Sequence, residues 1–503
     1  MPGQPVRTMM SRRGFLVTLT GLASTTLLAA CSPPSPSAAT NSAPPTQPAL
    51  TKPTSSTVAP VQAAASTPAS ALTTGKTTPV AAAAGPTYTP AKLDGVTLNV
   101  WILDFAPFKE FWPKLADRFG QLTGATLNFQ PQAWPLEVKL IAAMAGGTVP
   151  DVVELMGRVL APLVPPKQEL LEPTDDSVFK AMGIDPSTYF TPGAIGSFLY
   201  DGKHWGIPMQ DNTVSTMMYT RSEWLDNSAA AKDLWPRTKG QDSFDSFESM
   251  WDLAKTLQQE SEGKVTVWGT NGEGWGRTNI FGVMKMLGVE WWDNQNKKFN
   301  MDSDAAVQAI DKVITIPSQQ LKIESELNQS GENAFIQGKV ALARSTISTQ
   351  SAAVDQNIQV VNVAAPPPVK GGKQAYVGEG GWGAAVPRQA KNKDAGLELL
   401  KWLITPEAQR IWLPIFGGTT PAVLSMRSDP LYQGAGANAE NTRTWLKYQP
   451  MTTYMGSGFG HEPTISAAWE AIAQDVRGGK LSSKEASQAA QEQFTAHFKE
   501  FYG

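Results

Sequence analysis

One glycine-rich segment of the chain, Gly378–Gly383, carries both a carboxylate and an indole. Trp382 offers a large, rigid apolar face that loses little rotamer entropy when it is covered. Glu379 can accept hydrogen bonds from two neighbouring hydroxyl groups, and a turn at this point needs only glycine. The glycines around Trp382 let a bound molecule approach the backbone closely. The segment therefore predicts non-covalent contact with a bound molecule through an apolar face and a carboxylate.

The same segment also matches the GxGxxG pattern of dinucleotide-binding loops. That motif needs a helix directly after it, so that the helix N-terminus faces phosphate. Here the residues 384–387, Ala-Ala-Val-Pro, follow, and they are strand-like and end in proline. The sequence thus argues against nucleotide binding, and we expect no cofactor.

Cysteine and histidine are too scarce for most metal and redox chemistry. The 503 residues include one Cys and three scattered His, so an intrachain disulfide and Cys-rich zinc or iron–sulfur sites are excluded. No HExxH, GxSxG or GxxxxGK[ST] motif occurs, and we expect no metal site. Six of the 42 Lys and Arg precede Asp94, which leaves 36 against 45 acidic residues and a charge of −9 for residues 94–503. A nucleic-acid binder needs a clustered basic face, which such an acidic body does not favour.

Strand and helix patterns alternate from Asp94 onward. Buried-strand patterns at 96–102, 125–129 and 150–155 are separated by helical spacing over 108–123 and 136–145. This order predicts an α/β fold whose parallel sheet has helices on both faces. Further strands are expected at 265–269, 340–344 and 359–364, and further helices from 244 onward (capped by Asp245 or Ser246) and at 303–313, 393–403, 406–413 and 465–477.

Ligands on such sheets bind at the carboxyl ends of the strands, and several polar and aromatic residues follow strands here. Asp104 and Arg158 follow the first and third strands, although Asp104 can instead cap the next helix and Arg158 can instead pair with Asp151 or Glu154. Trp134 follows the second strand, and Trp275 lies in a glycine-rich loop after a later one. For both tryptophans, ligand contact and core packing are equally good interpretations.

Residues 1–30 have the pattern of an export signal. Arg12 and Arg13 precede an apolar stretch that ends in Leu28-Ala-Ala-Cys31. The arginine pair resembles a twin-arginine signal, with Val17 where that signal often has Lys, so the Sec route stays open. The final four residues resemble a bacterial lipobox, which implies cleavage before Cys31 and a lipid anchor on that residue. The stretch is too short and too rich in Ser and Thr for a membrane span.

Residues 31–93 are expected to form a linker between this anchor and a folded body. Of the 59 positions in 32–90, 46 are Pro, Ala, Ser or Thr, a composition that buries too little apolar surface to offset its ordering entropy. We therefore expect an extracytoplasmic protein, anchored by a lipid on Cys31 in the periplasm or on the outer face of the bacterial cell membrane.

From about Val96 to the C-terminus, five blocks in order resemble the extracellular solute-binding proteins of bacterial ABC importers, the sugar-binding family that includes maltose-binding protein. They are 142–153 (Ala-Ala-Met-Ala-Gly-Gly-Thr-Val-Pro-Asp-Val-Val), 205–219 (from Trp-Gly-Ile-Pro to Met-Met-Tyr), 335–342 (Phe-Ile-Gln-Gly-Lys-Val-Ala-Leu), 380–409 (from Gly-Gly-Trp-Gly to Thr-Pro-Glu-Ala-Gln) and 417–421 (Gly-Gly-Thr-Thr-Pro). The chain departs from the family at 219–221, where Tyr-Thr-Arg replaces Tyr-Asn-Lys, and at Leu342, where the family has Met.

This resemblance implies a two-lobed periplasmic-binding-protein-like fold of type II, with discontinuous lobes joined by crossing segments around a ligand cleft. One lobe would hold 94–208 and 381–422, and the other 209–380 and 423–503. Closure on ligand would be a hinge motion. The resemblance also implies a monomer that delivers its solute to the transmembrane subunits of an ABC permease.

A sugar ring has apolar C–H faces and a rim of hydroxyls, so a sugar cleft needs aromatic platforms and planar polar groups. Gln210, Asp211 and Asn212 lie on the first crossing, where Asp211 can instead serve as a turn cap. Trp382 is the preferred platform, with a plug in the hinge as its alternative. The expected ligand contacts are Asp104, Trp134, Arg158, Gln210, Asp211, Asn212, Trp275, Glu379, Gly380 and Trp382.

Other tryptophans have patterns typical of packing. Trp402 and Trp412 lie in helices with Leu and Ile, and Trp101 lies inside a strand. For the adjacent pair Trp291 and Trp292, packing within a lobe is also favoured.

The sequence leaves three functions open. The first is a non-catalytic receptor for a sugar or oligosaccharide, and the second is a receptor for another solute such as a polyamine, a peptide or a ferric ion. A polyamine needs aromatic faces and carboxylates, which the chain has, whereas ferric sites favour clustered tyrosines. The third is an exported glycoside hydrolase that would use two carboxylates such as Asp211 and Glu379, against which the two-lobe pattern argues.

Overall fold

The computed structural model describes residues 86–503 apart from Trp134, 166–167, 212–216, 272–275, 326–330, 346–348, 350–351, 354–355, 365–368, 371, 416–419, 434–445, 457–458, 460–461 and Gly503. Residues 79–503 form one compact unit. Within the described part of the chain, no helix combines the length and the apolar character that crossing a bilayer requires.

The first of two large sheets has five strands in the order β2-β1-β3-β17-β6. Strands β1 (Thr97–Leu103), β2 (Thr126–Gln132) and β3 (Val152–Met156) are parallel, as the alternating pattern predicts. Strand β17 (Trp382–Ala385) comes from much later in the chain and runs antiparallel to both β3 and β6 (Ile207–Pro208). This long-range insertion is invisible to local sequence patterns.

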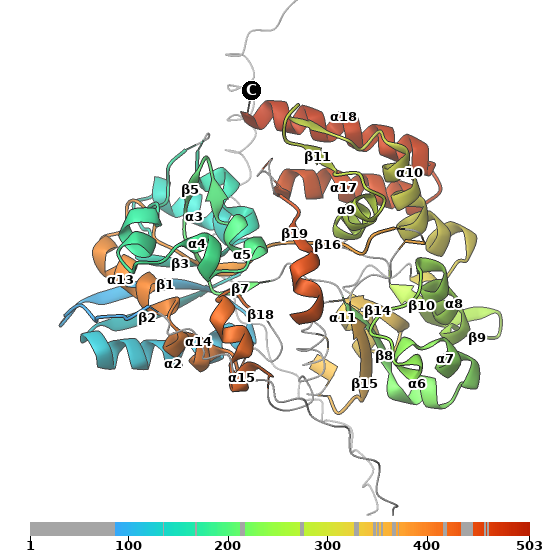
Figure 1. The fold of residues 1–503 in the computed structure, drawn as a ribbon, viewed down its shortest axis with the longest axis horizontal. Coiled ribbons are helices and arrows are strands. Elements are labelled where there is room, and N and C mark those ends of the chain that lie inside the picture. The colour runs from blue at the N-terminus through green and yellow to red at the C-terminus, as the bar shows by residue number, and fades with distance from the viewer. Residues whose placement is uncertain are drawn as a thin grey trace, which may run out of the picture. The chain divides into compact units, whose positions relative to one another are not determined.

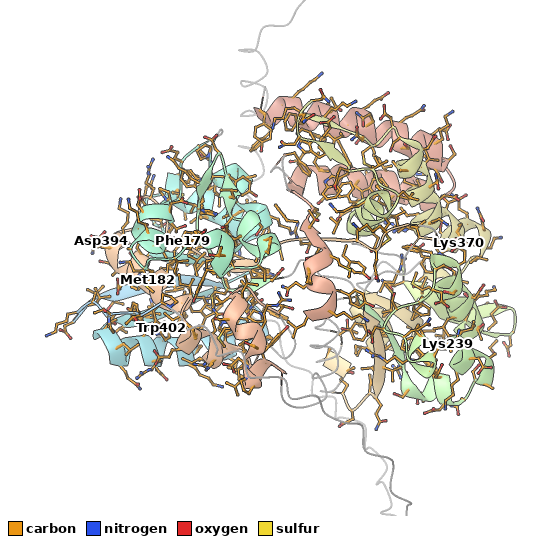
Figure 2. The ribbon with its side chains drawn as sticks, viewed as in Figure 1. Phe179, Met182, Lys239, Lys370, Asp394 and Trp402 are labelled. Carbon is orange, nitrogen blue, oxygen red and sulfur yellow. The ribbon has the colours of Figure 1, made fainter. Side chains whose placement is uncertain are left out.

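Helices cover both faces of the first sheet (Figure 1). Val100 and Ile102 of β1 join one apolar cluster, whereas Trp101 between them joins another, because successive side chains in a strand point to opposite faces. The first cluster includes residues of α2 (Ala106–Thr123), α13 (Lys393–Leu403) and α14 (Pro406–Trp412), and the second includes residues of α3 (Leu136–Ala145). Trp402, labelled in Figure 2 with Phe179, belongs to the first cluster. We call this sheet and its helices the first lobe.

The second sheet has the order β13-β10-β14-β8-β15, with β9 (Gln259–Ser261) beside β10. Strands β10 (Lys264–Asn271), β13 (Glu324–Ser325) and β14 (Val340–Ser345) are parallel, whereas β8 (Met217–Arg221) runs antiparallel to β14 and β15 (Val360–Ala364). The surrounding helices are α8 (Phe247–Leu257), α9 (Gly276–Met286), α10 (Asp304–Ile310), α17 (Glu462–Arg477) and α18 (Ser483–Tyr502). This sheet and its helices form the second lobe, with an apolar core of its own.

Two helix ends of the second lobe show what local patterns can specify. The Ser246 hydroxyl accepts a hydrogen bond from the Ser249 N–H and caps α8, which decides between the two caps expected there. The helix expected over 303–313 instead ends its α-helical part at Ile310 and continues as a π-helix, η5 (Asp311–Gln320). Pro317 lies inside that continuation, where its missing N–H is compatible with altered hydrogen bonding.

Three segments pass between the two lobes. The first runs from β6 to β8 and contains β7 (Gln210–Asp211), and the second runs from β16 (Tyr376–Gly378) to β17. The third passes near residues 446–448, because Leu446 packs with the first lobe and Tyr448 with the second. The first lobe was expected to end at residue 422. Met426 and Tyr432 also pack with the first lobe, so its packing extends beyond that boundary.

Pairs of short strands join these segments to one another. Strand β7 pairs with β18 (Thr420–Pro421), and β16 pairs with β19 (Thr452–Tyr454). Figure 1 shows all four labels between the two lobes. Backbone hydrogen bonds therefore connect the first and second crossing segments to the later part of the chain that contains β18 and β19.

The start of the folded unit is fastened to the first lobe. The Leu93 N–H donates to the Thr123 carbonyl (2.7 Å), and the Ala91 N–H donates to the Glu398 carboxylate (3.2 Å). Tyr88 packs against the apolar cluster beneath α2 and α13. Residues 88–93, which the composition assigns to the linker, thus contact the folded body.

The remaining elements are short. They are β4 (Leu199–Tyr200), β5 (Lys203–His204), β11 (Trp292–Asp293), β12 (Lys298–Phe299), α4 (Pro186–Tyr189), α5 (Pro192–Gly196), α6 (Ser222–Asp226), α7 (Ala229–Leu234), α11 (Gly331–Ile336), α15 (Pro430–Gln433), the 3-10 helices η1 (Gly157–Val159), η2 (Ala161–Leu163), η4 (Pro236–Lys239), η6 (Leu424–Ser428) and η7 (Gln449–Met451), and the π-helix η3 (Asp175–Lys180).

Candidate functional site

The carboxyl ends of β1 and β3 lie at the same edge of the first sheet, because these strands are parallel neighbours. Strand β17 is antiparallel to β3, so its first residue, Trp382, pairs with Met156 at that same edge. Asp104 follows β1, Arg158 follows β3, and Glu379 precedes β17. The topology therefore gathers four of the expected ligand contacts along one edge of the first lobe.

An ion pair links two of these residues across the edge. The Arg158 guanidinium lies 3.3 Å from the Glu379 carboxylate, with exposed side-chain fractions of 15% and 2%. Asp151 and Glu154, the other expected partners of Arg158, instead accept hydrogen bonds from the backbone N–H groups of Asn99 and Leu103. Glu379 thus brings a buried, paired charge into the second crossing segment.

The glycines beside Glu379 are required by close contacts within the protein. Gly380 has a φ of +88°, and a Cβ atom at this position would lie 2.4 Å from the Ser197 Cβ. A Cβ at Gly383 would lie 1.8 Å from the Ile207 carbonyl oxygen. The second crossing segment thus packs closely against the end of α5 and against β6. The sequence had suggested that these glycines make room for a ligand.

Trp382 lies between the two apolar clusters of the first lobe and is partly buried. Its ring meets the buried Phe108 ring edge to face, with centroids 5.4 Å apart. Phe108 in turn contacts Phe105, a residue that is 38% exposed. Phe105 is absent from the expected site, although its position directly after the first strand, beside Asp104, is a signal that could have revealed it.

Asp104 pairs with a lysine of the helix that follows it, α2. Its carboxylate lies 2.7 Å from the Lys109 ammonium, and both side chains are about half exposed. The N-terminal cap of α2 is Phe105, and no side chain caps that helix, so the cap function considered for Asp104 is not what the structure shows. A ligand contact by Asp104 stays a prediction.

Gln210 and Asp211 are buried on the first crossing, with exposed fractions of 1% and 3%. Asp211 accepts a hydrogen bond from the Gln449 amide, which joins the first crossing to the start of the second lobe's final segment. Burial lowers the pKa of Arg427, and the negative charge of nearby Asp211 opposes that effect. The Gln210 Oε1 atom is buried and has no hydrogen-bond partner among the described residues, and a ligand contact by Gln210 stays a prediction.

The other expected residues lie outside the described part of the chain. They are Trp134, Asn212 and Trp275 among the ligand contacts, and Arg12, Arg13 and Cys31 at the N-terminus. Their functions stay predictions.

The second lobe presents a polar group at the corresponding edge of its sheet. Asn271 ends β10 and exchanges hydrogen bonds with the Arg344 backbone on β14, and Arg344 also donates to the Asn271 carbonyl. Glu324 on β13 lies 2.6 Å from the Arg477 guanidinium and 3.9 Å from that of Arg344. This group has no signal in the sequence, because each residue lies in an ordinary strand or helix and only the sheet brings them together.

The tryptophans expected to pack are indeed buried. Exposed fractions are 9% for Trp101, 0% for Trp402 and Trp412, 2% for Trp291 and 6% for Trp292. Trp291 stacks on Phe281, whereas Trp292 contacts Phe299 and Phe459 within the same core. These five residues are therefore excluded as ligand platforms.

A sequence profile described as bacterial extracellular solute-binding protein matches residues 114–440. The chain belongs to this family. The family consists of binding proteins, so the hydrolase considered from Asp211 and Glu379 is not supported. No curated protein sequence matches the chain.

Solved structures of solute-binding proteins share the fold. The maltose/maltodextrin-binding domain MalE from Bdellovibrio bacteriovorus, bound to maltotriose, aligns with a TM-score of 0.63 at 16% identity over 80% of this chain and 100% of its own. The GacH receptor of Streptomyces glaucescens GLA.O, solved unliganded and with acarbose, gives 0.65 at 18% identity over 81% and 99%. A Thermotoga lettingae ABC transporter solute-binding protein bound with alpha-D-tagatose gives 0.65 at 17% identity over 81% and 100%. The expected two-lobed α/β fold is confirmed.

Proposed function

We propose that this protein is a carbohydrate receptor that binds a sugar or oligosaccharide between its lobes and delivers it to an ABC permease. The observation that carries the proposal is the edge of the first lobe, where aromatic rings and a buried ion pair lie together at the ends of β1, β3 and β17. Aromatic rings cover the C–H faces of sugars, and carboxylate, guanidinium and amide groups satisfy their hydroxyls.

The structural neighbours support the same ligand class. Those compared above were solved with maltotriose, acarbose and tagatose. The acidic body and the aromatic edge are also compatible with a polyamine, but no structural neighbour named above carries such a ligand. A sugar is therefore the ligand class that both the site and the neighbours favour.

We propose that the lobes meet at the crossing segments and close by a hinge motion. The first lobe would hold 94–208 and 381–422, extended through Tyr432 because that residue packs with the first lobe, and the second would hold 209–380 and the remaining C-terminal part. Closure would bury the aromatic edge and bring the second lobe's polar groups to the ligand. The permease would then recognise the closed form.

The experiment that tests the ligand class is thermal unfolding of the full chain, in a detergent without a sugar headgroup, against mono- and oligosaccharides, polyols and polyamines. A ligand that binds only the native state at a thousandfold excess over Kd adds about 4 kcal/mol to its stability. A raised melting temperature with an intact sugar, recovered unchanged, is expected. A shift with polyamines alone would overturn the carbohydrate proposal and leave the fold as it is.

We also propose that residues 1–30 direct export, with Arg12 and Arg13 as the twin-arginine pair, and that a lipid on Cys31 anchors the chain outside the cytoplasm. The position of the one cysteine at the end of a lipobox-like sequence supports this proposal. A Cys31→Ser substitution is expected to abolish incorporation of a radiolabelled fatty acid and to change the mass of the processed chain. Unchanged labelling would contradict the anchor.

A further inference from the structure

Phe105 is exposed at the edge where the ligand contacts gather. Six large apolar side chains are exposed among the described residues, and Phe105 and Tyr502 are the two aromatic ones. Phe105 lies two residues after the end of β1 and directly before α2, so it lies at the carboxyl edge of the first sheet. An aromatic residue left 38% exposed at this place presents an apolar surface that a ligand can cover.

The position of Phe105 in the helix makes this exposure more informative. Phe105 is the N-cap of α2, an 18-residue helix, and no side chain caps the helix N–H groups there. Ser, Thr, Asp and Asn stabilise helices at this position because their oxygens accept hydrogen bonds from those N–H groups. Phenylalanine gives up this stabilisation, so the requirements of the helix do not explain its presence.

The ring of Phe105 is held in a fixed relation to Trp382. Phe108 is 1% exposed, and its ring meets Phe105 at 5.5 Å and 84° and Trp382 at 5.4 Å and 65°. Phe111 also contacts Phe108, with ring centroids 5.4 Å apart. The buried Phe108 ring thus contacts both Phe105 and Trp382 and fixes where these two rings lie.

We propose that Phe105 is a specificity-determining residue that provides a second aromatic surface beside Trp382, so that the site selects a ligand of at least two linked sugar rings over a monosaccharide. This inference rests on the proposed carbohydrate function and deepens it. One sugar ring covers one aromatic ring, and a linked second ring can cover the other. The contact with Phe105 then contributes only to the binding of longer ligands.

The test is calorimetric titration of the full chain and three Phe105 variants with homologous series of probes: glucose, maltose and maltotriose, and glucose, cellobiose and cellotriose. Phe105→Ser is expected to lower the affinity for the longer sugars about tenfold, the factor for a ring contact worth about 1.4 kcal/mol. The affinity for the monosaccharide is expected to stay within about twofold. Phe105→Trp keeps the flat face and is expected to keep the affinity, whereas Phe105→Leu keeps only the apolar bulk and is expected to lose it.

The Ser variant also separates binding from folding. It supplies the missing cap of α2, so its melting temperature is expected to match or exceed that of the unmodified chain while its affinity for longer sugars falls. Equal affinities of Phe105→Ser and the unmodified chain for every sugar length would overturn the inference, as would an equal loss at all lengths. If the unmodified chain binds monosaccharides alone, the inference fails and the carbohydrate function stands. If it binds no sugar in either series or in the wider panel, the proposed function fails, and the inference fails with it.

Discussion

The carboxyl edges of the two sheets have opposite chemistry. The first lobe presents aromatic rings, of which Phe105 and Trp382 retain exposed surface, around the Arg158–Glu379 pair. The second lobe presents Asn271, Glu324 and Arg344, which are buried and bonded mainly to one another. The first edge thus offers apolar surface of the kind that a ligand can cover, whereas the second edge is a polar frame of buried, mutually bonded groups.

Two buried glutamates repeat this contrast. Glu324 in the second lobe has two arginines beside it, and the Arg344 guanidinium also lies over the Trp251 ring at 5.1 Å. Glu154 in the first lobe lies inside β3 and accepts a hydrogen bond from the Leu103 N–H. Burial raises the pKa of Glu154 to about 8, and that hydrogen bond acts in the opposite direction. One lobe compensates a buried charge with cations, and the other keeps its acid protonated at neutral pH.

The largest effect is expected from breaking the polar frame of the second lobe. Glu324→Ala leaves two arginines without their carboxylate, of which Arg344 is 1% exposed. Removing one member of a buried ion pair costs about 3–5 kcal/mol, because the remaining charge is left buried. The free energy of unfolding, measured in urea, is expected to fall by that amount. The exposed pair Lys480–Asp475 supplies the control, since Asp475→Ala is expected to cost less than about 1 kcal/mol. Similar costs for the two variants would contradict the frame.

The next effect concerns the second crossing segment, which runs from β16 to β17. Gly380→Ala combines a positive φ with a Cβ atom 2.4 Å from the Ser197 Cβ, and together these are expected to cost about 3 kcal/mol. Gly240 has a φ of +70° but open space around its Cβ position, so Gly240→Ala is expected to cost only about 1 kcal/mol. Chemical unfolding measures both variants. Equal costs would show that the contact with Ser197 relaxes and that φ alone sets the requirement.

A smaller, pH-dependent effect is expected from Glu154. The pKa of this group is about 8 in the folded chain against an ordinary value of 4.5, so the folded state holds an extra proton between these values. The contribution of Glu154 to the free energy of unfolding is therefore fully present below pH 4.5 and is lost as the pH rises to 8. The free energy of unfolding falls by at most about 1.4 kcal/mol per pH unit in this range. Glu154→Gln cannot titrate and is expected to remove that slope, whereas the exposed control Glu110→Gln keeps it. A slope that survives in Glu154→Gln would assign it to another group.

The smallest effect on stability is expected at the rim of the first edge. Asp104 and Lys109 form an exposed pair, so Asp104→Asn is expected to change the free energy of unfolding by less than about 1 kcal/mol. Ligand affinity is expected to fall, because the carboxylate lies at the end of β1. Lys109→Met breaks the same pair and leaves the carboxylate in place. Equal losses of affinity in both variants would show that the pair, and not Asp104 itself, affects the ligand.

Local patterns predicted the strands and helices of the first lobe well, because its first three strands follow one another in the sequence. The position of β17 in that sheet needed the family resemblance, since 225 residues separate Met156 from its partner Trp382 in β17. Arg158 and Glu379 were each expected in the site, but their pairing was not, because spacing gives no distance across the edge. The one local signal for Phe105 is its position beside Asp104 after the first strand, whereas the Glu324 group has no such signal, because only the second sheet assembles it.

The attachment of residues 88–93 to the first lobe has a mechanical consequence for a tethered molecule. Any force transmitted along the chain from its N-terminal side enters the folded unit through Tyr88, Ala91 and Leu93, which contact α2, α13 and the cluster beneath them. These contacts bypass the three crossing segments. In the proposed lipid-anchored receptor, the first lobe would therefore be the part held by the tether and the second lobe the part that moves, so that tension in the tether would not act across the crossing segments.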